Sequence, residues 1–265
     1  MEFENKTILL TGASTGIGEE IAKKLAMINC RLILLARRTN LIEEYLSELN
    51  NIRADIDVIQ CDVSKKDSVY ESMIKIRSKI KSKIQGMSKN KNNIDIAILN
   101  AGISYRTDIT EFNSKHAEEI FGVNVMGIIY WVEQLLPEMM ERKNGMIVGV
   151  SSLADSRGHA KSEFYCASKA AATKILEGLR VELHSYNIKV VTVKPGFVET
   201  PMTSKNKFKM PLLMKPEKAA DIILRGIEKE KPVIAFPMPI VFASWLGGIL
   251  PSRVYEFFAK RVKVR

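Results

Sequence analysis

Tyr165 and Lys169 are the residues of this sequence best suited to acid–base chemistry. They stand four positions apart in residues 163–186, where apolar residues recur at helical spacing. Side chains four apart share one face of a helix. An adjacent ammonium favours the phenolate and lowers the tyrosine pKa from about 10. We therefore predict that Tyr165 exchanges a proton near neutral pH, although such a pair alone is more commonly a surface contact.

A glycine-rich run, Thr11-Gly12-Ala13-Ser14-Thr15-Gly16-Ile17-Gly18, lies between an apolar run at residues 7–10 and a helical pattern. Glycine permits a tight turn and a close approach of the backbone to a ligand. The N-terminus of the following helix presents unpaired N–H groups and the positive end of its dipole to a phosphate. A structural turn is the alternative, but the strand–turn–helix context favours a dinucleotide site.

The elements that would position these residues alternate between short runs rich in Ile, Val and Leu and helical patterns, as in βαβ units. The runs show little polar alternation, which is typical of strands covered on both faces. We predict an α/β fold: a single Rossmann-like domain over residues 1–265, with a doubly wound parallel sheet of about seven strands and helices on both faces. The predicted strands are 7–10, 31–36, 57–60, 94–99, 145–150, 189–193 and 232–236. The predicted helices are 17–27, 41–50, 64–83, 121–142, 163–186 and 216–229.

The end of the second predicted strand bears on the choice of dinucleotide. An acidic residue at this place bonds the ribose 2′-hydroxyl of NAD, but this chain has Ala36 followed by Arg37 and Arg38. A guanidinium can bind the 2′-phosphate of NADP with two hydrogen bonds, whereas a carboxylate would repel it. Ser14 could donate a further bond. We predict NADP(H) in preference to NAD(H), carried by Arg37, while Arg38 could equally be a plain surface charge.

The charge balance of 40 Lys and Arg against 30 Asp and Glu gives a net charge of +10, which favours anionic partners in general. Much of the surplus lies in residues 79–91, which we interpret as a solvated helix end and loop. Aromatic residues are not interleaved with this run, so it lacks the stacking platform of single-strand nucleic-acid binders. We expect no nucleic-acid partner.

Cysteine and histidine spacing gives no metal or disulfide signal, so we predict no metal and a reducing, cytoplasmic location. The N-terminus does not have the pattern of a signal peptide. His159, between Ser152 and Tyr165, could contact substrate. The absence of G-x-S-x-G does not support a serine hydrolase. The residues considered are Cys30, Cys61, Cys166, His116, His159 and His184.

The complete set of motifs resembles the classical type of the short-chain dehydrogenase/reductase family, over nearly the whole chain. The glycine spacing is G-x-x-x-G-x-G, and Y-x-x-x-K begins thirteen residues after Ser152. The resemblance implies a nicotinamide-dependent oxidoreductase that moves a hydride between NAD(P)(H) and a carbonyl or secondary alcohol. The other matching residues are Asn100-Ala101-Gly102, Asn124, Ser151-Ser152, Pro195-Gly196 and Thr200.

The resemblance implies four catalytic residues. Tyr165 would donate the proton in reduction and accept it in oxidation, and Ser152 would hydrogen-bond the substrate oxygen. Lys169 would also bind the nicotinamide ribose, and Asn124 would support a water-linked proton path to that lysine. Ser151 is the nearest rival of Ser152, but the family spacing selects Ser152. Asn124 could instead be a structural asparagine at a helix bend.

The resemblance also implies cofactor contacts. Asp62 would meet the adenine amino group beside Val63, or cap the next helix, or do both. Thr200 would bond the nicotinamide carboxamide or a phosphate. One departure is Thr15, at a place that is often basic in NADP-preferring relatives. The cofactor-binding set is Gly12, Ser14, Thr15, Gly16, Ile17, Gly18, Arg37, Arg38, Asp62, Val63, Asn100, Ala101, Gly102, Tyr165, Lys169, Pro195, Gly196, Val198 and Thr200.

Two further segments bear on the substrate and partners. Residues 199–215 predict a substrate lid, as a mobile loop or small helix pair, and its Met, Phe and Leu side chains favour a hydrophobic substrate. Residues 237–265 predict a core, subunit-interface or pocket element. The uncharged residues 233–250 contain two prolines and Gly247-Gly248, so we expect no transmembrane span, while Phe257, Phe258 and a basic tail leave peripheral membrane contact open.

Three interpretations of function remain open. The leading one is an NADP(H)-dependent carbonyl reductase or alcohol dehydrogenase. The second is a hydroxysteroid or lipid-alcohol dehydrogenase that acts oxidatively, and the third is a non-catalytic NADP(H)-binding sensor. The resemblance also implies a homodimer or homotetramer, formed through the helices predicted at 121–142 and 163–186.

Overall fold

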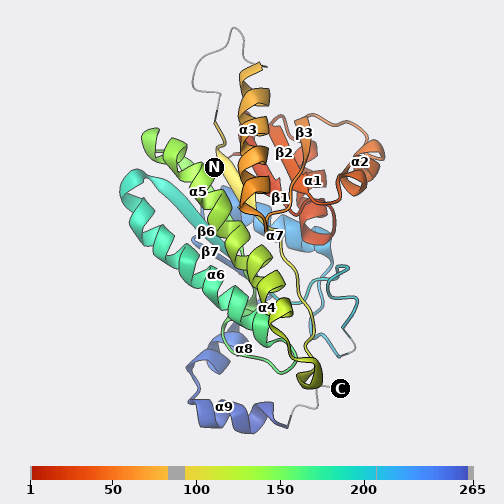
Figure 1. Ribbon diagram of the computed structural model, residues 1–265, viewed down its shortest axis with the longest axis vertical. Helices are drawn as coiled ribbons and strands as arrows, with labels where there is room; N and C mark the ends of the chain where they lie inside the picture. Colours follow the sequence, from red (N-terminus) through yellow and green to blue (C-terminus); the bar gives the residue numbers. More distant parts are fainter. Residues whose placement is uncertain (1, 83–92, 207, 262–265) are drawn as a thin grey trace.

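The computed structural model describes residues 2–82, 93–206 and 208–261. In this part of the chain seven strands form one parallel sheet in the order β3-β2-β1-β4-β5-β6-β7 (Figure 1). The order reverses between β1 and β4, and ligands of such sheets bind outside the carboxyl ends of the strands at this switch point. The strands are β1 (Thr7–Thr11), β2 (Arg31–Ala36), β3 (Asp55–Gln60), β4 (Ile96–Leu99), β5 (Gly145–Val150), β6 (Ile188–Pro195) and β7 (Val233–Phe236). The predicted fold class is confirmed. Most of the basic run 79–91, which the sequence indicates as a solvated helix end and loop, lies outside the described residues.

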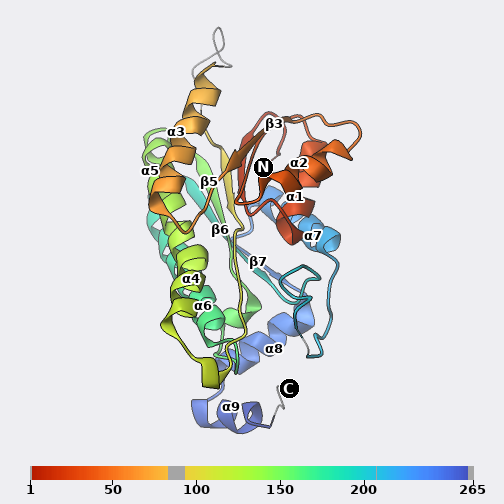
Figure 2. The ribbon, with the colours of Figure 1, turned by 45° about the vertical axis from the view of Figure 1, so that its right-hand side comes forward.

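Helices cover both faces of the sheet (Figures 1 and 2). On one face, α1 (Gly16–Ala26), α2 (Thr39–Ser47) and α7 (Pro216–Glu228) share a core with Ile8 and Leu10 of β1. On the other face, α3 (Lys66–Ser82), α5 (Gly127–Glu141) and α6 (Glu163–Glu182) share a core with Leu9. Successive residues of β1 thus enter opposite cores. This explains why the strand runs show no apolar–polar alternation.

The close packing of α6 on β5 sets the position of the helix that carries Tyr165 and Lys169. A Cβ atom at Gly149 would lie 2.3 Å from Cδ1 of Leu176, so the missing side chain of Gly149 makes room for that leucine. Leu176 and Ala172 are fully buried between helix and strand. This contact fixes the height of α6 over the carboxyl end of β5, and hence the placement of Tyr165 and Lys169.

The helix predicted at 121–142 begins earlier than expected and contains a π-helical turn. It runs from α4 (Ser114–Phe121) through the π turn Gly122–Met126 into α5. The Asn113 side chain caps its start by accepting the N–H of His116 at 3.2 Å. The first turns of α4 are polar, so the apolar periodicity from which helices were predicted does not extend to this start. Among the described residues this is the one helix long and apolar enough to cross a membrane, but half of its most apolar window is buried. It serves as a core layer on the sheet.

The described part of residues 199–215 forms a loop and not the helix pair that was the alternative prediction. Val198 and Met214 form a parallel β-bridge, and the N–H of Glu199 donates to the Met214 carbonyl at 2.9 Å. The described part of the segment consists of turns and extended chain. Both ends of the segment are therefore fixed to each other beside β6.

The chain after β7 forms two helices that sequence reasoning did not predict, α8 (Met238–Ile249) and α9 (Ser252–Ala259). They lie at one end of the long axis, opposite the end of α3 (Figures 1 and 2). Neither helix has a buried residue. The interpretation of residues 237–265 as a core element is therefore wrong: an uncharged run looks like core by composition, but this one lies at the surface.

Candidate active site

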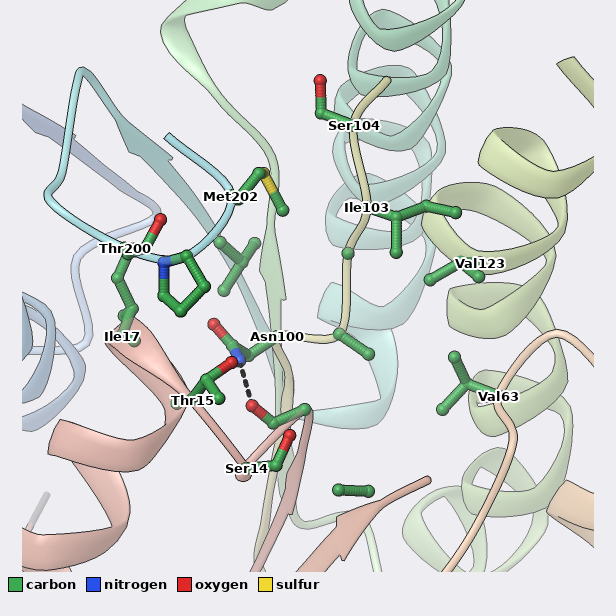
Figure 3. Close-up of a pocket in the computed structure, with 18 of the residues that line it drawn as sticks. Ser14, Thr15, Ile17, Val63, Asn100, Ile103, Ser104, Val123, Thr200 and Met202 are labelled. Atoms are coloured by element: carbon green, nitrogen blue, oxygen red, sulfur yellow. Dashed lines mark hydrogen bonds between the residues drawn. The ribbon is translucent and has the colours of Figure 1, made fainter. Parts of the chain in front are cut away.

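A cavity of about 720 Å³ lies at the carboxyl edge of the sheet, within the range of about 300–1,000 Å³ that is typical of ligand pockets. Every residue predicted to bind cofactor or to be catalytic lines it, with the single exception of Asn124. In Figure 3, Thr200 and Met202 face Ile103 and Val123 across it. The lining residues that sequence reasoning did not assign are Leu35, Cys61, Ile103, Ser104, Tyr105, Val123, Val150, Pro201 and Thr203. Most of these directly adjoin a predicted motif, so extending each motif by its neighbours would have found them.

The glycine turn between β1 and α1 brings two loops into contact. Gly12 and Gly16 have φ values of +67° and +63°, which side chains disfavour. A Cβ at Gly12 would lie 2.8 Å from Cα of Ala101, and one at Gly16 would lie 2.8 Å from Cγ2 of Thr200. The Asn100 carboxamide donates to the carbonyls of Thr11 and Gly12, each at 3.1 Å. These contacts hold the turn against the end of β4 and leave the N-terminus of α1 facing the cavity (Figure 3).

Two arginine side chains lie at the edge of the cavity, where β2 ends. Ala36 is buried, and Arg37 and Arg38 line the cavity with exposed side chains. The backbone carbonyl of Arg37 accepts a hydrogen bond from Gln60 Nε2 at 3.1 Å, which links the ends of β2 and β3. Ser14 of the glycine turn lines the same cavity. No carboxylate occupies the place of Ala36, so nothing there would repel a ribose phosphate.

Asp62 follows β3 by two residues, where the sequence predicted an adenine contact, a helix cap or both. It lines the cavity, while its Oδ1 accepts hydrogen bonds from the N–H and the hydroxyl of Ser64, at 3.0 and 2.8 Å. Its own N–H donates to Ser68 Oγ at 3.0 Å. The carboxylate thus orders the turn that leads into α3 and still borders the cavity.

The cluster of Ser152, Tyr165 and Lys169 lies deep in the cavity. Lys169 is 3% exposed, and its Nζ donates to the Val150 carbonyl at 2.8 Å and lies 5.8 Å from the centroid of the Tyr165 ring. Ser152 Oγ accepts the N–H of Ala154 at 3.1 Å and lies 3.5 Å from the Pro195 carbonyl. A hydroxyl, a phenol and an amine thus meet at one end of the cavity, beside the carboxyl ends of β5 and β6.

Burial, and not the nearby lysine, is the main cause of the shifted pKa values in this cluster. Burial raises the pKa of Tyr165 above its ordinary value, and a hydrogen bond with Ser152 opposes this only in part. Burial also lowers the pKa of Lys169 to about 8. The expectation that Lys169 lowers the Tyr165 pKa is therefore wrong for the protein by itself. Both groups are inside the protein, where the charged form of each is penalised.

Asn124 lies in the π turn, is fully buried, and is not a lining residue. Its Oδ1 accepts the N–H of Ile103 at 2.8 Å, and its Nδ2 donates to the Ile103 carbonyl and to Ser168 Oγ, each at 3.0 Å. A Cβ at Gly102 would lie 3.4 Å from this Oδ1 and 3.3 Å from Lys169 Nζ. The asparagine therefore clamps the loop after β4 to the catalytic helix, as its structural interpretation predicted, directly beside the lysine.

Sequence reasoning missed a buried polar network beneath the cluster. Asp155 Oδ2 accepts from Lys194 Nζ at 2.8 Å and from the Thr173 hydroxyl at 2.6 Å. That hydroxyl lies 2.7 Å from Ser151 Oγ, and Ser151 donates to the Lys169 carbonyl at 2.9 Å. The network joins the turn after β5, strand β6 and helix α6. Both serines line the cavity, but the Ser151 hydroxyl is engaged in this network, and it is Ser152 that hydrogen-bonds Tyr165.

Several predicted pocket residues do not reach the cavity. Of the apolar residues expected in the lid, only Met202 lines it, together with Lys205; Leu212 and Leu213 point to solvent, and Met214 packs on the core. His159 is exposed and does not line it, and neither do α8 and α9. The first residues of the predicted lid thus border the cavity, whereas its later apolar residues and helices α8 and α9 do not. No group of three or more metal-ligating side chains occurs among the described residues.

A doubly wound parallel sheet, a glycine turn at its switch point and a buried Ser–Tyr–Lys cluster define a nucleotide-binding oxidoreductase fold. The family model for short chain dehydrogenases matches residues 6–210. The chain belongs to this family of nicotinamide-dependent oxidoreductases, and the family prediction is confirmed.

The chain is similar over most of its length to curated relatives and solved structures. An uncharacterized oxidoreductase of Myxococcus xanthus is 30% identical over 99% of both chains. Human estradiol 17-beta-dehydrogenase 11 is 28% identical over 97% of this chain and 83% of its own. A Sphingobium yanoikuyae short-chain dehydrogenase in complex with NADPH superimposes with a TM-score of 0.77 at 21% identity, covering 97% of this chain and 96% of that chain. A Burkholderia phymatum enzyme in complex with NAD gives 0.80 at 20% identity, covering 93% and 94%.

Proposed function

We propose that the protein is an NADP(H)-preferring oxidoreductase that interconverts an apolar carbonyl compound and the corresponding secondary alcohol. The observation that carries this proposal is the single cavity that joins the Arg37 edge and glycine turn to the buried Ser152, Tyr165 and Lys169. One end suits a phosphorylated ribose, and the other offers hydrogen-bond and proton donors to a reacting oxygen.

The residues present fit a nicotinamide dinucleotide. The close contacts of Gly12 and Gly16 make a cradle that a side chain would fill, and the start of α1 faces it. Arg37 and Ser14 would hold the 2′-phosphate, Asp62 and Val63 the adenine, and Thr200 the nicotinamide end. When bound, the dinucleotide supplies or accepts the hydride.

The cluster residues would carry out the proton chemistry. Ser152 would donate a hydrogen bond to the substrate oxygen, and Tyr165 would supply its proton as negative charge develops there. The raised pKa of Tyr165 keeps the phenol protonated before the reaction. Lys169, whose pKa lies at about 8, would take part in proton return beside Asn124.

Apolar side chains in the cavity wall support an apolar substrate. Ile103, Val123 and Met202 border the cavity (Figure 3). Resemblance to an estradiol dehydrogenase supports the second candidate, oxidation of a steroid or lipid alcohol. The same pocket would serve both candidates, since the reaction is reversible and the cofactor ratio decides its direction.

A cofactor-coupled screen of aldehydes, ketones and secondary alcohols, run with NADPH and with NADH, tests the proposal. We expect turnover of bulky apolar ketones with NADPH, and little turnover in the matched Tyr165→Phe protein. Tight NADPH binding, seen by fluorescence titration, with no turnover across the panel would favour the sensor instead. Activity confined to small polar carbonyls would contradict the apolar substrate.

Assembly and location are further parts of the proposal. We propose a homodimer or homotetramer, formed through the outer faces of α5 and α6, in the cytoplasm. The exposed Val181 on α6, at 77%, supports an interface there. A molar mass of one chain in light scattering would contradict it.

A further inference from the structure

The helices α8 and α9 form an apolar surface at one end of the molecule, here called the C-terminal surface (Figures 1 and 2). Six of its large side chains are 42–62% exposed, and α8 contains no charged residue. Phe242, Trp245, Leu246 and Ile249 recur at helical spacing, so they share one face of α8, and an exposed apolar face marks an interaction site. The six residues are Phe242, Trp245, Leu246, Ile249, Phe257 and Phe258.

The C-terminal surface is anchored to the body of the protein by polar contacts. Ser244 Oγ donates to the Leu153 carbonyl at 2.9 Å, and Arg157 Nε donates to the Gly247 carbonyl at 2.8 Å. The guanidinium of Arg157 also lies 5.1 Å from the Tyr255 ring, whose hydroxyl donates to the Gly158 carbonyl at 2.7 Å. Because polar atoms bind the helices to the body, the apolar side chains are left facing outward.

The charges around this surface are mostly positive. Arg253, Lys260 and Arg261 of the α9 segment are exposed, against the single carboxylate of Glu256, which pairs with Lys260 at 3.4 Å. The whole chain carries a net charge of +10. Aromatic and aliphatic side chains flanked by cations are the pattern of helices that lie in a membrane interface.

We propose that the C-terminal surface docks the protein on an anionic lipid bilayer. α8 has 12 residues and is about 18 Å long, too short to cross a hydrocarbon core of about 30 Å. It therefore lies in the plane of the interface. A second copy of the chain is a poorer occupant, because pairing two such surfaces would bring together two α9 segments that each carry a net positive charge.

Docking would place the reaction site close to the lipid. All strands are parallel, so the edge from which β7 leads into α8 is the edge that carries the cavity. Leu153, which accepts the hydrogen bond from Ser244 of α8, directly follows Ser152. This inference goes beyond the proposed function and does not depend on it, since binding to lipid requires no catalysis.

Tryptophan fluorescence tests the proposal directly. The chain has two tryptophans: Trp131 is 1% exposed and Trp245 is 57% exposed, so a change on adding vesicles reports on Trp245. With mixed phosphatidylcholine–phosphatidylglycerol vesicles we expect a blue shift and co-flotation, both weakened by high salt. Replacing Arg253, Lys260 and Arg261 by Gln should weaken binding about fivefold per charge.

Matched variants separate docking from nonspecific adhesion. Phe242→Ser should weaken flotation at least tenfold, whereas Ile74→Ser, which removes an exposed apolar side chain from α3, should leave it unchanged. Both variants should keep wild-type turnover of a water-soluble carbonyl. Absence of the blue shift at low salt, or equal binding to pure phosphatidylcholine, would overturn the proposal. A blue shift that grows with protein concentration without vesicles would assign the surface to a second copy instead.

Discussion

The ionisable side chains at the two ends of the cavity lie in opposite environments, one buried and the other open to solvent. At the inner end Lys169 is 3% exposed, and burial moves the pKa of Lys169 down to about 8 and that of Tyr165 up. At the outer end Arg37 and Arg38 are exposed to solvent, where their interactions are screened by water and salt. Under the proposed function, the inner end would carry the proton chemistry and the outer end would select the cofactor. Substitutions at the two ends should have effects that differ in kind and in size.

The largest expected effect is at the inner end. Tyr165→Phe removes the proposed proton donor and keeps the ring, so we expect kcat to fall by about 10²–10⁴-fold with NADPH affinity nearly unchanged. Steady-state kinetics and a fluorescence titration on the same preparation measure both. Activity within tenfold of wild type would mean that another group supplies the proton.

The second prediction concerns Lys169 and pH. The unfolded side chain has a pKa of 10.5 and the folded one about 8, so between these values the unfolded chain binds more protons and stability rises with pH. We expect the unfolding free energy of wild type, relative to Lys169→Met, to increase by about 3 kcal/mol from pH 7 to pH 10. Urea unfolding of both proteins at both pH values measures this, because shared titrations cancel. A difference that does not change with pH would contradict a buried, shifted lysine.

The third prediction tests the network beneath the cluster. Asp155→Asn breaks a pair whose carboxylate is 3% exposed and whose Lys194 is 23% exposed, and should cost about 1–3 kcal/mol of unfolding free energy. The matched control is Asp221→Asn, whose pair with Lys24 is 42% and 32% exposed, and it should cost less than about 1 kcal/mol. Equal losses of unfolding free energy in the two variants would show that the Asp155–Lys194 pair stabilises the protein no more than an exposed pair does.

The smallest effect is expected at the outer end. Arg37→Ala should reduce the preference for NADPH over NADH about tenfold, because one charge-assisted contact in solvent is lost, and leave kcat with saturating NADPH unchanged. Arg38→Ala is the control and should change the preference less. The ratio of kcat/KM values at low and high salt measures both, and the wild-type preference should fall as salt rises. An unchanged preference in Arg37→Ala would remove this residue from cofactor selection.

Features carried by contiguous segments could be predicted from sequence. The glycine turn follows its strand and opens its helix within one short run, and Tyr165 and Lys169 share a helix face, so their local order fixes their geometry. The Asp155–Lys194 pair could not be predicted, because its members meet only when β5 and β6 become neighbours.

Burial was the other quantity that the sequence did not reveal. The sign of the Tyr165 shift depends on how completely the fold encloses it, which no spacing encodes. The uncharged run of α8 has the composition of core, yet none of its residues is buried. Apolar periodicity identifies the residues that can be buried, but the packing of neighbouring elements determines which of them are buried.

Transfer of an isotope label tests the central claim most directly. NADPH that carries deuterium at the transferable position of its dihydronicotinamide ring would be incubated with the protein and an apolar ketone from the screen, and the alcohol examined by mass spectrometry. We predict one deuterium on the carbinol carbon with wild type, and almost none with Tyr165→Phe although NADPH still binds. Alcohol formed without the label, or label transfer at the wild-type rate in Tyr165→Phe, would contradict hydride transfer assisted by this phenol.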